Sequence, residues 1–257
     1  MTSLPALLAA AEPVEGGFRA HVPANWLQGR TAYGGFSSAL ALEAALRCEP
    51  DLPPLRSAQI AFIGPLAGAV TVTATKLRRG RNAAFVQADV TSDAGLGLRA
   101  TFVFMAERES AVRHDAGLAT DRRPPAPDQA LYQGPPEFFT SNFQFLDLKA
   151  EAHGPTEWLR WGRLIEREGL HPAVELMAVA DALPPAAMKL LGSFGPVSSL
   201  TWQLNLTTSP PQTQDGWWLL RAEADAAAGG SSSQNMTLWN AEGLLAVQAM
   251  QSVALFV

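Results

Sequence analysis

The stretch from Gly35 to Arg47 limits what this chain can fold into more than any other. Its sequence, GFSSALALEAALR, is apolar on almost every side of the helix it would form. A helix with so small a polar face belongs in a protein core or in a membrane. No apolar run in the chain reaches the length of a membrane span, and Glu43 and Arg47 interrupt this one. The stretch therefore predicts a buried core helix that the rest of the fold must cover.

The bulk composition restricts the class of protein further. The 257 residues are 47% apolar and 17% charged, which is typical of a folded protein with a substantial core. A formal charge of −5 without a basic stripe argues against a nucleic-acid partner. Cys48 is the only cysteine, and the N-terminal segment has no basic leader. We therefore expect a cytoplasmic protein without a disulfide framework and without a membrane span.

The order of predicted elements repeats along the chain. A charged, proline-rich segment near residues 107–136 separates two halves, each with one apolar helix followed by about four strands that alternate between polar and apolar residues. The predicted helices cover residues 35–47 and 173–183. We therefore divide the chain into a first repeat (1–106), a crossover linker (107–140) and a second repeat (141–257). Wrapping a curved antiparallel sheet around each helix buries both apolar surfaces, so the predicted class is α+β.

Several common catalytic signatures are missing from the sequence. There is no nucleophile elbow of the G-x-S-x-G type in a suitable context, and the four histidines are scattered without ligand spacing. We therefore expect no metal and no cofactor. An enzyme built on this chain would have to use carboxylate, amide and hydroxyl side chains together with backbone dipoles.

Two polar side chains stand in rows that are otherwise apolar. Gln251 is the only polar residue on the strand face formed by Leu245, Val247, Ala249, Val253 and Leu255. Asp181 interrupts the second apolar helix one turn before two prolines, where an acid is mildly unfavourable for the helix dipole. Each could be structural, with Gln251 satisfying a backbone group and Asp181 reaching solvent. Each could also be functional, with Gln251 positioning a water and Asp181 acting as a general base.

Two further groups are candidates for the same site. Ser199 and Thr201 lie on the polar face of a predicted strand, and alternation alone does not decide which hydroxyl, if either, is chemical. Tyr33, Gly34 and Gly35 open the first core helix. Glycines at a helix start let a ligand approach the free N–H groups, which suit a carbonyl that gains negative charge. Tight packing of the helix start is the competing explanation.

Long stretches of the chain resemble the TesB-like acyl-CoA thioesterases of the thioesterase II type. The segments GRTAYGGFSSALALEAALR and LRSAQIAFIGP, with the strands that follow, are similar to the first repeat of that family. LMAVADALPPA, VSSLTWQLNL and GLLAVQAMQSVALF are similar to the second repeat. The resemblance covers nearly the whole chain from about Trp26. It implies a double hotdog fold, an acyl-CoA substrate and association into homo-oligomers.

The resemblance also implies roles for individual residues. The family holds and activates a water with an Asp, a Thr or Ser, and a Gln, which fall on Asp181, Ser199 and Gln251. Tyr33, Gly34, Gly35 and Thr201 are then expected to bind substrate. The family often has threonine where this chain has Ser199. A non-catalytic acyl-CoA or lipid-binding hotdog protein is the alternative. A hotdog hydratase is disfavoured, because no histidine falls in the first core helix or beside Asp181.

Overall fold

The computed structural model describes residues 1–257 except 113, 115–118, 149–150, 152–153, 193–194 and 257. The helices are α1 (Leu4–Ala9), α2 (Gly34–Cys48) and α3 (Pro172–Ala180), with short 3-10 helices η1 (Ala24–Trp26), η2 (Phe139–Asn142), η4 (Ala186–Leu190) and η5 (Gln214–Gly216). The first strands are β1 (Glu12–Val14), β2 (Gly17–Val22), β3 (Leu27–Gln28), β4 (Thr31–Ala32), β5 (Leu55–Phe62), β6 (Gly68–Arg79), β7 (Ala83–Ser92) and β8 (Gly95–Met105). The later strands are β9 (Phe143–Asp147), β10 (Glu157–Leu164), β11 (Val197–Leu206), β12 (Trp218–Ala228), β13 (Ser231–Asn240) and β14 (Leu245–Leu255).

One antiparallel sheet runs through both halves of the chain. Within the described residues it has twelve strands in the order β1-β2-β6-β7-β8-β5-β11-β14-β13-β12-β10-β9. The halves join where β5 pairs with β11, with Gln59 opposite Gln203 near the middle of the ladder. Because this pairing is continuous, the strands of the second half are fixed in register against those of the first.

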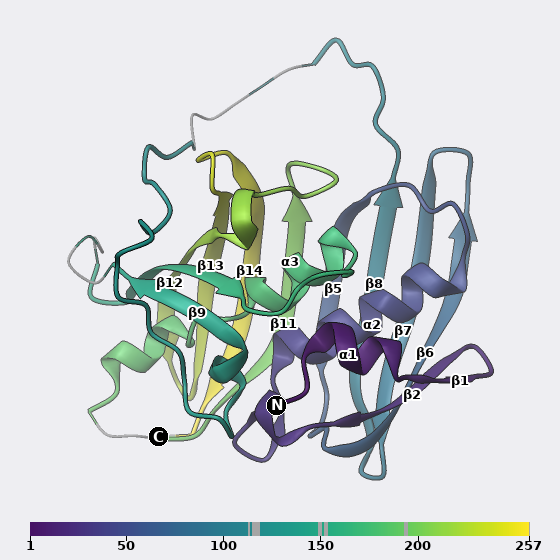
Figure 1. The fold of residues 1–257 in the computed structure, drawn as a ribbon, viewed down its shortest axis with the longest axis horizontal. Helices are drawn as coiled ribbons and strands as arrows, with labels where there is room; N and C mark the ends of the chain where they lie inside the picture. Colours follow the sequence, from purple (N-terminus) through teal and green to yellow (C-terminus); the bar gives the residue numbers. More distant parts are fainter. Residues whose placement is uncertain (113, 115–118, 149–150, 152–153, 193–194, 257) are drawn as a thin grey trace.

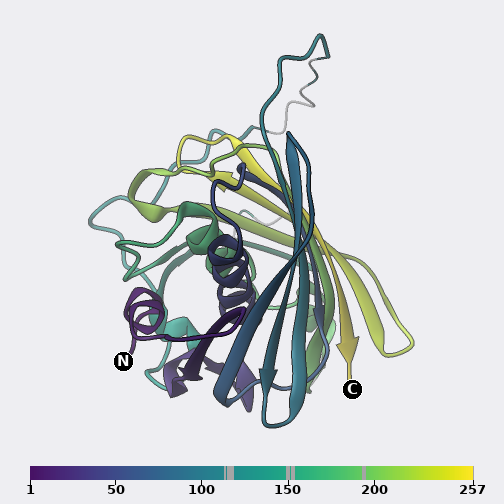
Figure 2. The ribbon, with the colours of Figure 1, turned by 90° about the vertical axis from the view of Figure 1, so that its right-hand side faces the viewer.

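The two longer helices lie in the hollow of the curved sheet (Figure 2). Helix α2 contains few residues of low helix propensity. It ends at Cys48, two residues before Pro50, because the residue before a proline disfavours helical backbone. Its residues from Gly35 to Leu42 are all buried, so the predicted core helix is confirmed. The architecture is the predicted α+β double hotdog, in which one sheet wraps two core helices. No helix in the described part of the chain is long and apolar enough to cross a membrane.

Helix α3 is shorter than the sequence predicted. It begins at Pro172, a residue suited to the first helical position, and it ends at Ala180 instead of Leu183. Ala182 closes the last turn by donating to the Val179 carbonyl at 3.0 Å. The prolines at 184 and 185 disfavour helical backbone just before them and explain the early end. Asp181 is therefore the C-terminal cap of α3 and does not lie within the helix.

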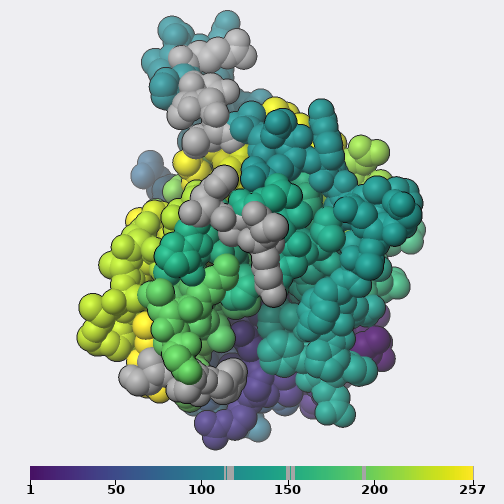
Figure 3. Space-filling view, turned by 90° about the vertical axis from the view of Figure 1, so that its left-hand side faces the viewer, coloured from purple at the N-terminus to yellow at the C-terminus, as the bar shows by residue number. Residues whose placement is uncertain are grey.

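The described part of the segment that we propose as the crossover, residues 107–140, runs along the outside of the second half (Figures 1 and 3). Thr120 donates a backbone hydrogen bond to Gly243 at 2.9 Å, and Tyr132 forms a bridge with Phe145. At its end Phe139 stacks on Tyr33, with ring centroids 4.1 Å apart. The crossover therefore reaches the start of α2, where it covers an aromatic side chain next to the paired glycines.

The N-terminal segment, which the sequence left without assigned elements, completes the first half. Strand β2 pairs with β6 and extends the sheet, while Leu4 of α1 is fully buried. Trp26 stacks on Phe36 of α2 with ring centroids 4.7 Å apart. These contacts cover the side of α2 that the other strands leave open.

The start of α2 packs so closely against α3 that only glycine fits at position 35. A Cβ there would lie 2.5 Å from the Tyr33 hydroxyl oxygen and 2.7 Å from the Ala178 carbonyl oxygen. The Tyr33 hydroxyl itself donates to that carbonyl at 2.9 Å. The two helices are thus joined at this point by a buried hydrogen bond that leaves no space for a methyl group.

We predict that Gly35→Ala destabilises the protein by about 1–3 kcal/mol, because overpacking against backbone outweighs the better helix propensity of alanine. Chemical denaturation monitored by circular dichroism measures the change. Gly192→Ala is the matched control, since a Cβ at Gly192 meets nothing within 4 Å. Equal stability of the two variants would contradict this account of the contact.

Candidate functional site

Asp181 projects from the end of α3 toward the start of α2. Its Oδ1 accepts a hydrogen bond from Gln251 Nε2 at 2.9 Å. The Gly35 N–H, in the first turn of α2, donates a further hydrogen bond to the same carboxylate. The positive end of a helix dipole favours a negative group at this position. The carboxylate is therefore held in the core by one side-chain amide and one backbone amide.

The paired glycines make this approach possible. A Cβ at Gly34 would lie 2.6 Å from Asp181 Oδ2 and 3.1 Å from the ring of Phe62. The sequence left two explanations for these glycines, ligand access or tight packing. The structure shows tight packing at Gly34, where the neighbouring groups are the Asp181 carboxylate and the Phe62 ring. The sequence predicted that the Gly35 N–H binds substrate, but in the structure this N–H donates to Asp181.

Burial changes the acid strength of Asp181. Removal from water raises the pKa of its carboxyl group from the usual 3.8 to about 7, although the hydrogen bonds from Gln251 and Gly35 oppose the rise. The pKa of the Tyr33 hydroxyl is raised well above 10, chiefly by burial and secondly by the negative charge of Asp181. Near neutral pH, Asp181 can therefore gain or lose a proton while Tyr33 stays neutral.

Gln251 is held in turn by a residue that the sequence analysis missed. Gln251 and Gln234 are directly opposite on β14 and β13, and both are buried. Gln234 Nε2 donates to Gln251 Oε1 at 2.7 Å. Gln234 Oε1 accepts from the Ala186 N–H at 2.7 Å. The sequence does contain a signal for Gln234, since it shares a strand face with the apolar residues Met236 and Leu238.

The structure separates Ser199 from Thr201, which the sequence placed on one face of the strand. The register of β11 against β14 shifts between them, so that Ser199 is opposite Val253 and Thr201 is opposite Ser252. Val253 is buried, so Ser199 lies on the inner face with Gln251. The interpretation of a shared face is wrong for Ser199, because an extra residue in a bulge reverses the alternation. No hydrogen bond joins Ser199 to Asp181 or Gln251 among the described residues.

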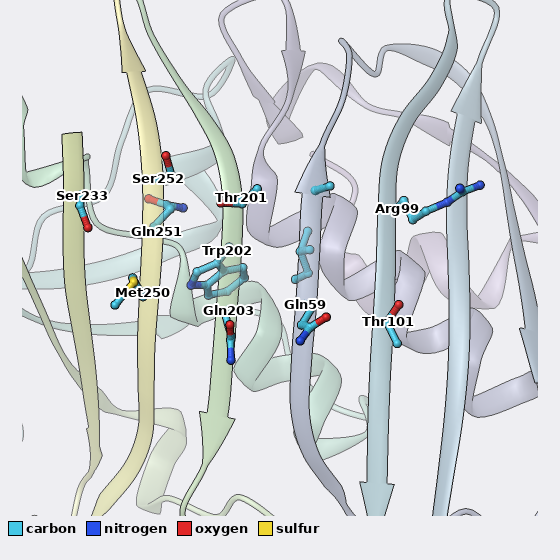
Figure 4. A pocket seen from close by; sticks show the side chains of 12 residues that line it. Gln59, Arg99, Thr101, Thr201, Trp202, Gln203, Ser233, Met250, Gln251 and Ser252 are labelled. Carbon is cyan, nitrogen blue, oxygen red and sulfur yellow. The ribbon is translucent and has the colours of Figure 1, made fainter. Parts of the chain in front are cut away.

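Thr201 instead lines a hollow on the outer face of the sheet. This hollow, of about 520 Å³, extends over strands from both halves (Figure 4). Its other lining residues are Gln59, Ile60, Ala61, Arg99, Thr101, Trp202, Gln203, Ser233, Met250, Gln251 and Ser252. Asp181 does not line it. The structure therefore does not bring Thr201 together with the Asp181 carboxylate.

The arrangement around Asp181 suits proton transfer by a carboxylate. A buried acid with a pKa near 7, held by amide donors, can accept a proton from a water at neutral pH. Within the described residues, no group of three or more His, Cys, Asp or Glu side chains could hold a metal ion. The chemistry on offer is thus that of a carboxylate with amide and backbone N–H groups around it.

Comparison with known families decides the class of protein. The acyl-CoA thioesterase N-terminal domain matches residues 22–105, and the acyl-CoA thioesterase C-terminal domain matches residues 116–255. The chain belongs to the acyl-CoA thioesterase family. It is accordingly a thioester hydrolase, and the site described above lies between its two matched domains, with Gly35 in the first and Asp181 in the second.

Solved structures share the fold over nearly the whole chain. A hot dog fold protein of unknown function from Alicyclobacillus acidocaldarius has a TM-score of 0.82 at 19% identity, covering 100% of this thioesterase and 99% of that chain. A TesB protein from Mycobacterium avium subspecies paratuberculosis has a TM-score of 0.79 at 19% identity, covering 98% of this chain and 99% of that chain. The acyl-CoA thioesterase II TesB2 from Mycobacterium marinum has a TM-score of 0.73 at 15% identity, covering 95% of this chain and 93% of that chain. No curated relative matches the chain. At these identities, the likeness shows the double hotdog fold alone.

The raised pKa of Asp181 makes this residue costly for stability, and we predict that Asp181→Asn is stabilising above neutral pH. The Asp181 carboxylate binds a proton more tightly in the folded protein than in the unfolded chain. Its contribution to the free energy of unfolding therefore falls as pH rises from about 4 to about 7, and it is constant above pH 7. At about 1.36 kcal/mol per pH unit, the cost at pH 8 is on the order of 4 kcal/mol. Thermal melts should show a higher Tm for Asp181→Asn than for wild type at pH 8, with the gap closing toward pH 4. A gap independent of pH would contradict the raised pKa.

Proposed function

We propose that this chain hydrolyses acyl-CoA thioesters to free acid and CoA, using a water that Asp181 activates. The observation that carries the proposal is the buried Asp181 carboxylate, held by Gln251 and by the first turn of α2, with a pKa of about 7. A general base is most effective when its pKa lies near the working pH. Membership of the acyl-CoA thioesterase family supports the substrate class.

The proposed reaction proceeds by attack of water on the thioester carbonyl carbon. As the C–O bond forms, Asp181 takes the water proton, and the carbonyl oxygen becomes negatively charged. The positive end of α2 at Gly34 stabilises this charge. The C–S bond then breaks, the carboxylic acid forms, and CoA leaves as a thiolate that takes up the proton from Asp181, which restores the base. A thiolate is a sufficiently good leaving group that the reaction needs little acid assistance.

Ser199 is the proposed hydroxyl partner of the water. The pairing of β11 with β14 supports this, since Ser199 shares the inner face with Gln251 while Thr201 is exposed on the other face. Tyr33 and the paired glycines then line the substrate side of the site at the start of α2. We also propose that the protein acts in the cytoplasm as a homo-oligomer, as the family resemblance implies.

We predict that Asp181→Asn lowers kcat by about 100-fold or more, and that Gln251→Ala lowers it by about 10- to 100-fold. Thiol release from acetyl- to palmitoyl-CoA, measured with a thiol-reactive dye, gives the rates and the preferred acyl length. Ser199→Ala should lower kcat by about 10-fold, whereas Thr201→Ala, the matched hydroxyl control, should leave it unchanged.

Full turnover by folded Asp181→Asn would contradict the assignment of the base. Tight binding of acyl-CoA without turnover of any substrate by the wild type would instead indicate a non-catalytic binding protein. Equal losses in Ser199→Ala and Thr201→Ala would remove the hydroxyl assignment and leave the role of Asp181 intact.

The pH dependence of wild-type activity is a separate prediction. Because the base must be ionised, kcat/KM should rise with pH and level off above an apparent pKa near 7. At pH 5 about 1% of Asp181 would be ionised, so kcat/KM should be roughly 100-fold below its plateau. Initial rates from pH 5 to 8, corrected for spontaneous thioester hydrolysis, measure the profile. A flat profile over this range would exclude a carboxylate with a raised pKa as the base.

A further inference from the structure

We propose that Gln234 is a positioning residue that fixes the orientation of the Gln251 amide, so that its NH₂ group and not its oxygen faces Asp181. The inference rests on the proposed role of Asp181 as the base. It assigns a function to a side chain that reaches the carboxylate only through another residue.

A continuous chain of hydrogen bonds carries the proposal. The Ala186 N–H donates to Gln234 Oε1 at 2.7 Å, and Gln234 Nε2 donates to Gln251 Oε1 at 2.7 Å. Gln251 Nε2 then donates to Asp181 Oδ1 at 2.9 Å. The exposed fractions of Gln234 and Gln251 are 0% and 2%, so both amides are removed from bulk solvent.

The donor-to-acceptor direction of this series of hydrogen bonds is fixed at one end by a group that cannot exchange its donor role for an acceptor role. A backbone N–H only donates, so it requires the oxygen of Gln234 at Ala186. The NH₂ group of Gln234 must then face Gln251, which presents its oxygen to Gln234 and its NH₂ group to Asp181. A flip of the Gln251 amide alone would bring an oxygen against the Asp181 carboxylate and two NH₂ groups against each other. Buried mismatches of this kind cost far more than one exposed hydrogen bond.

The two glutamines, Gln234 and Gln251, also bind both ends of the segment that runs from Asp181 to Ala186. Ala186 is the first residue of η4, and Pro185 before it has no N–H. The N–H of Ala186 is one of the donors that the start of a helix leaves without a partner, and Gln234 Oε1 accepts its hydrogen bond. Asp181 and Ala186 lie at the two ends of one short segment, and the two glutamines bind both ends. Gln234 is therefore itself held in place by the segment that follows Asp181.

Few groups near Asp181 carry charge. From the residue that caps α2, the neutral Tyr33 hydroxyl faces it, and that hydroxyl donates a hydrogen bond to the Ala178 carbonyl of α3. Strands β13 and β14 present amides, and β11 presents the indole of Trp202 opposite Gln251. The Lys189 ammonium of η4 binds the Glu157 carbonyl and lies over the ring of Trp158. Burial raises the pKa of Asp181 most, and the hydrogen bond from the Gln251 amide is the next largest influence and lowers it.

The test is the pH profile of kcat/KM for Gln234→Met. Loss of the donor frees the Gln251 amide to turn, so we expect the acid limb to move about 0.5 to 1 pH unit upward and kcat to fall about 10-fold, with KM nearly unchanged. Gln248→Met, on the exposed face of the same strand as Gln251, is the matched control and should keep the wild-type profile. A residue with a purely structural role would lower the Tm without moving the acid limb.

A double-variant comparison makes the mechanism specific. Gln251→Met should move the acid limb at least as far as Gln234→Met, and the double variant should match Gln251→Met alone, because Gln234 acts only through Gln251. Additive shifts, or an unmoved limb in Gln234→Met, would overturn the proposal. Full turnover by Asp181→Asn would overturn the proposed function instead, so the two failures are distinguishable.

A measurement on the wild type covers the case in which Gln234→Met does not fold. In protein labelled with ¹⁵N-glutamine, one side-chain NH₂ group should exchange slowly and shift as pH passes through the acid limb of kcat/KM. That is the signature of a buried amide that donates to the titrating carboxylate. The absence of any protected glutamine NH₂ signal that follows this limb would overturn the proposal.

Discussion

The contact between the Asp181 carboxylate and the start of α2 is the constraint on which the rest of the structure depends. It requires a helix start without a side chain at Gly34, and it requires a carboxylate at the end of an apolar helix. Burying a carboxylate is unfavourable unless hydrogen bonds compensate, and here Gln251 and the Gly35 N–H supply them. The partial compensation leaves a pKa near 7, which is the property that a base at neutral pH needs.

The double hotdog architecture brings these groups together from distant parts of the chain. The continuous pairing of β5 with β11 holds the two halves as one sheet, and the two core helices lie side by side in its hollow (Figures 1 and 2). The glycines come from the first half, whereas Asp181 and Gln251 come from the second. Neither half alone contains the site, which explains how one chain can need two similar repeats for a single centre.

Much of this arrangement could be predicted from the sequence, for identifiable reasons. The core helix and most strands follow from the periodicity of apolar residues, and Gln251 and Asp181 stand out as polar residues in apolar rows. The placement of Ser199 could not be predicted, because a bulge reversed the alternation on which the prediction relied. Gln234 was missed although its pattern resembles that of Gln251. Its importance depends on a cross-strand neighbour and on the Ala186 N–H, which only the fold brings to it.

The most direct test of the account is an NMR titration of Asp181 with ¹³C-labelled aspartate, assigned by the signal that is lost in Asp181→Asn. The account predicts a carboxyl resonance that titrates near pH 7, at the same midpoint as the acid limb of kcat/KM. Titration near the usual value of 3.8, or a midpoint that differs clearly from the kinetic one, would contradict the claim that this buried carboxylate is the catalytic base.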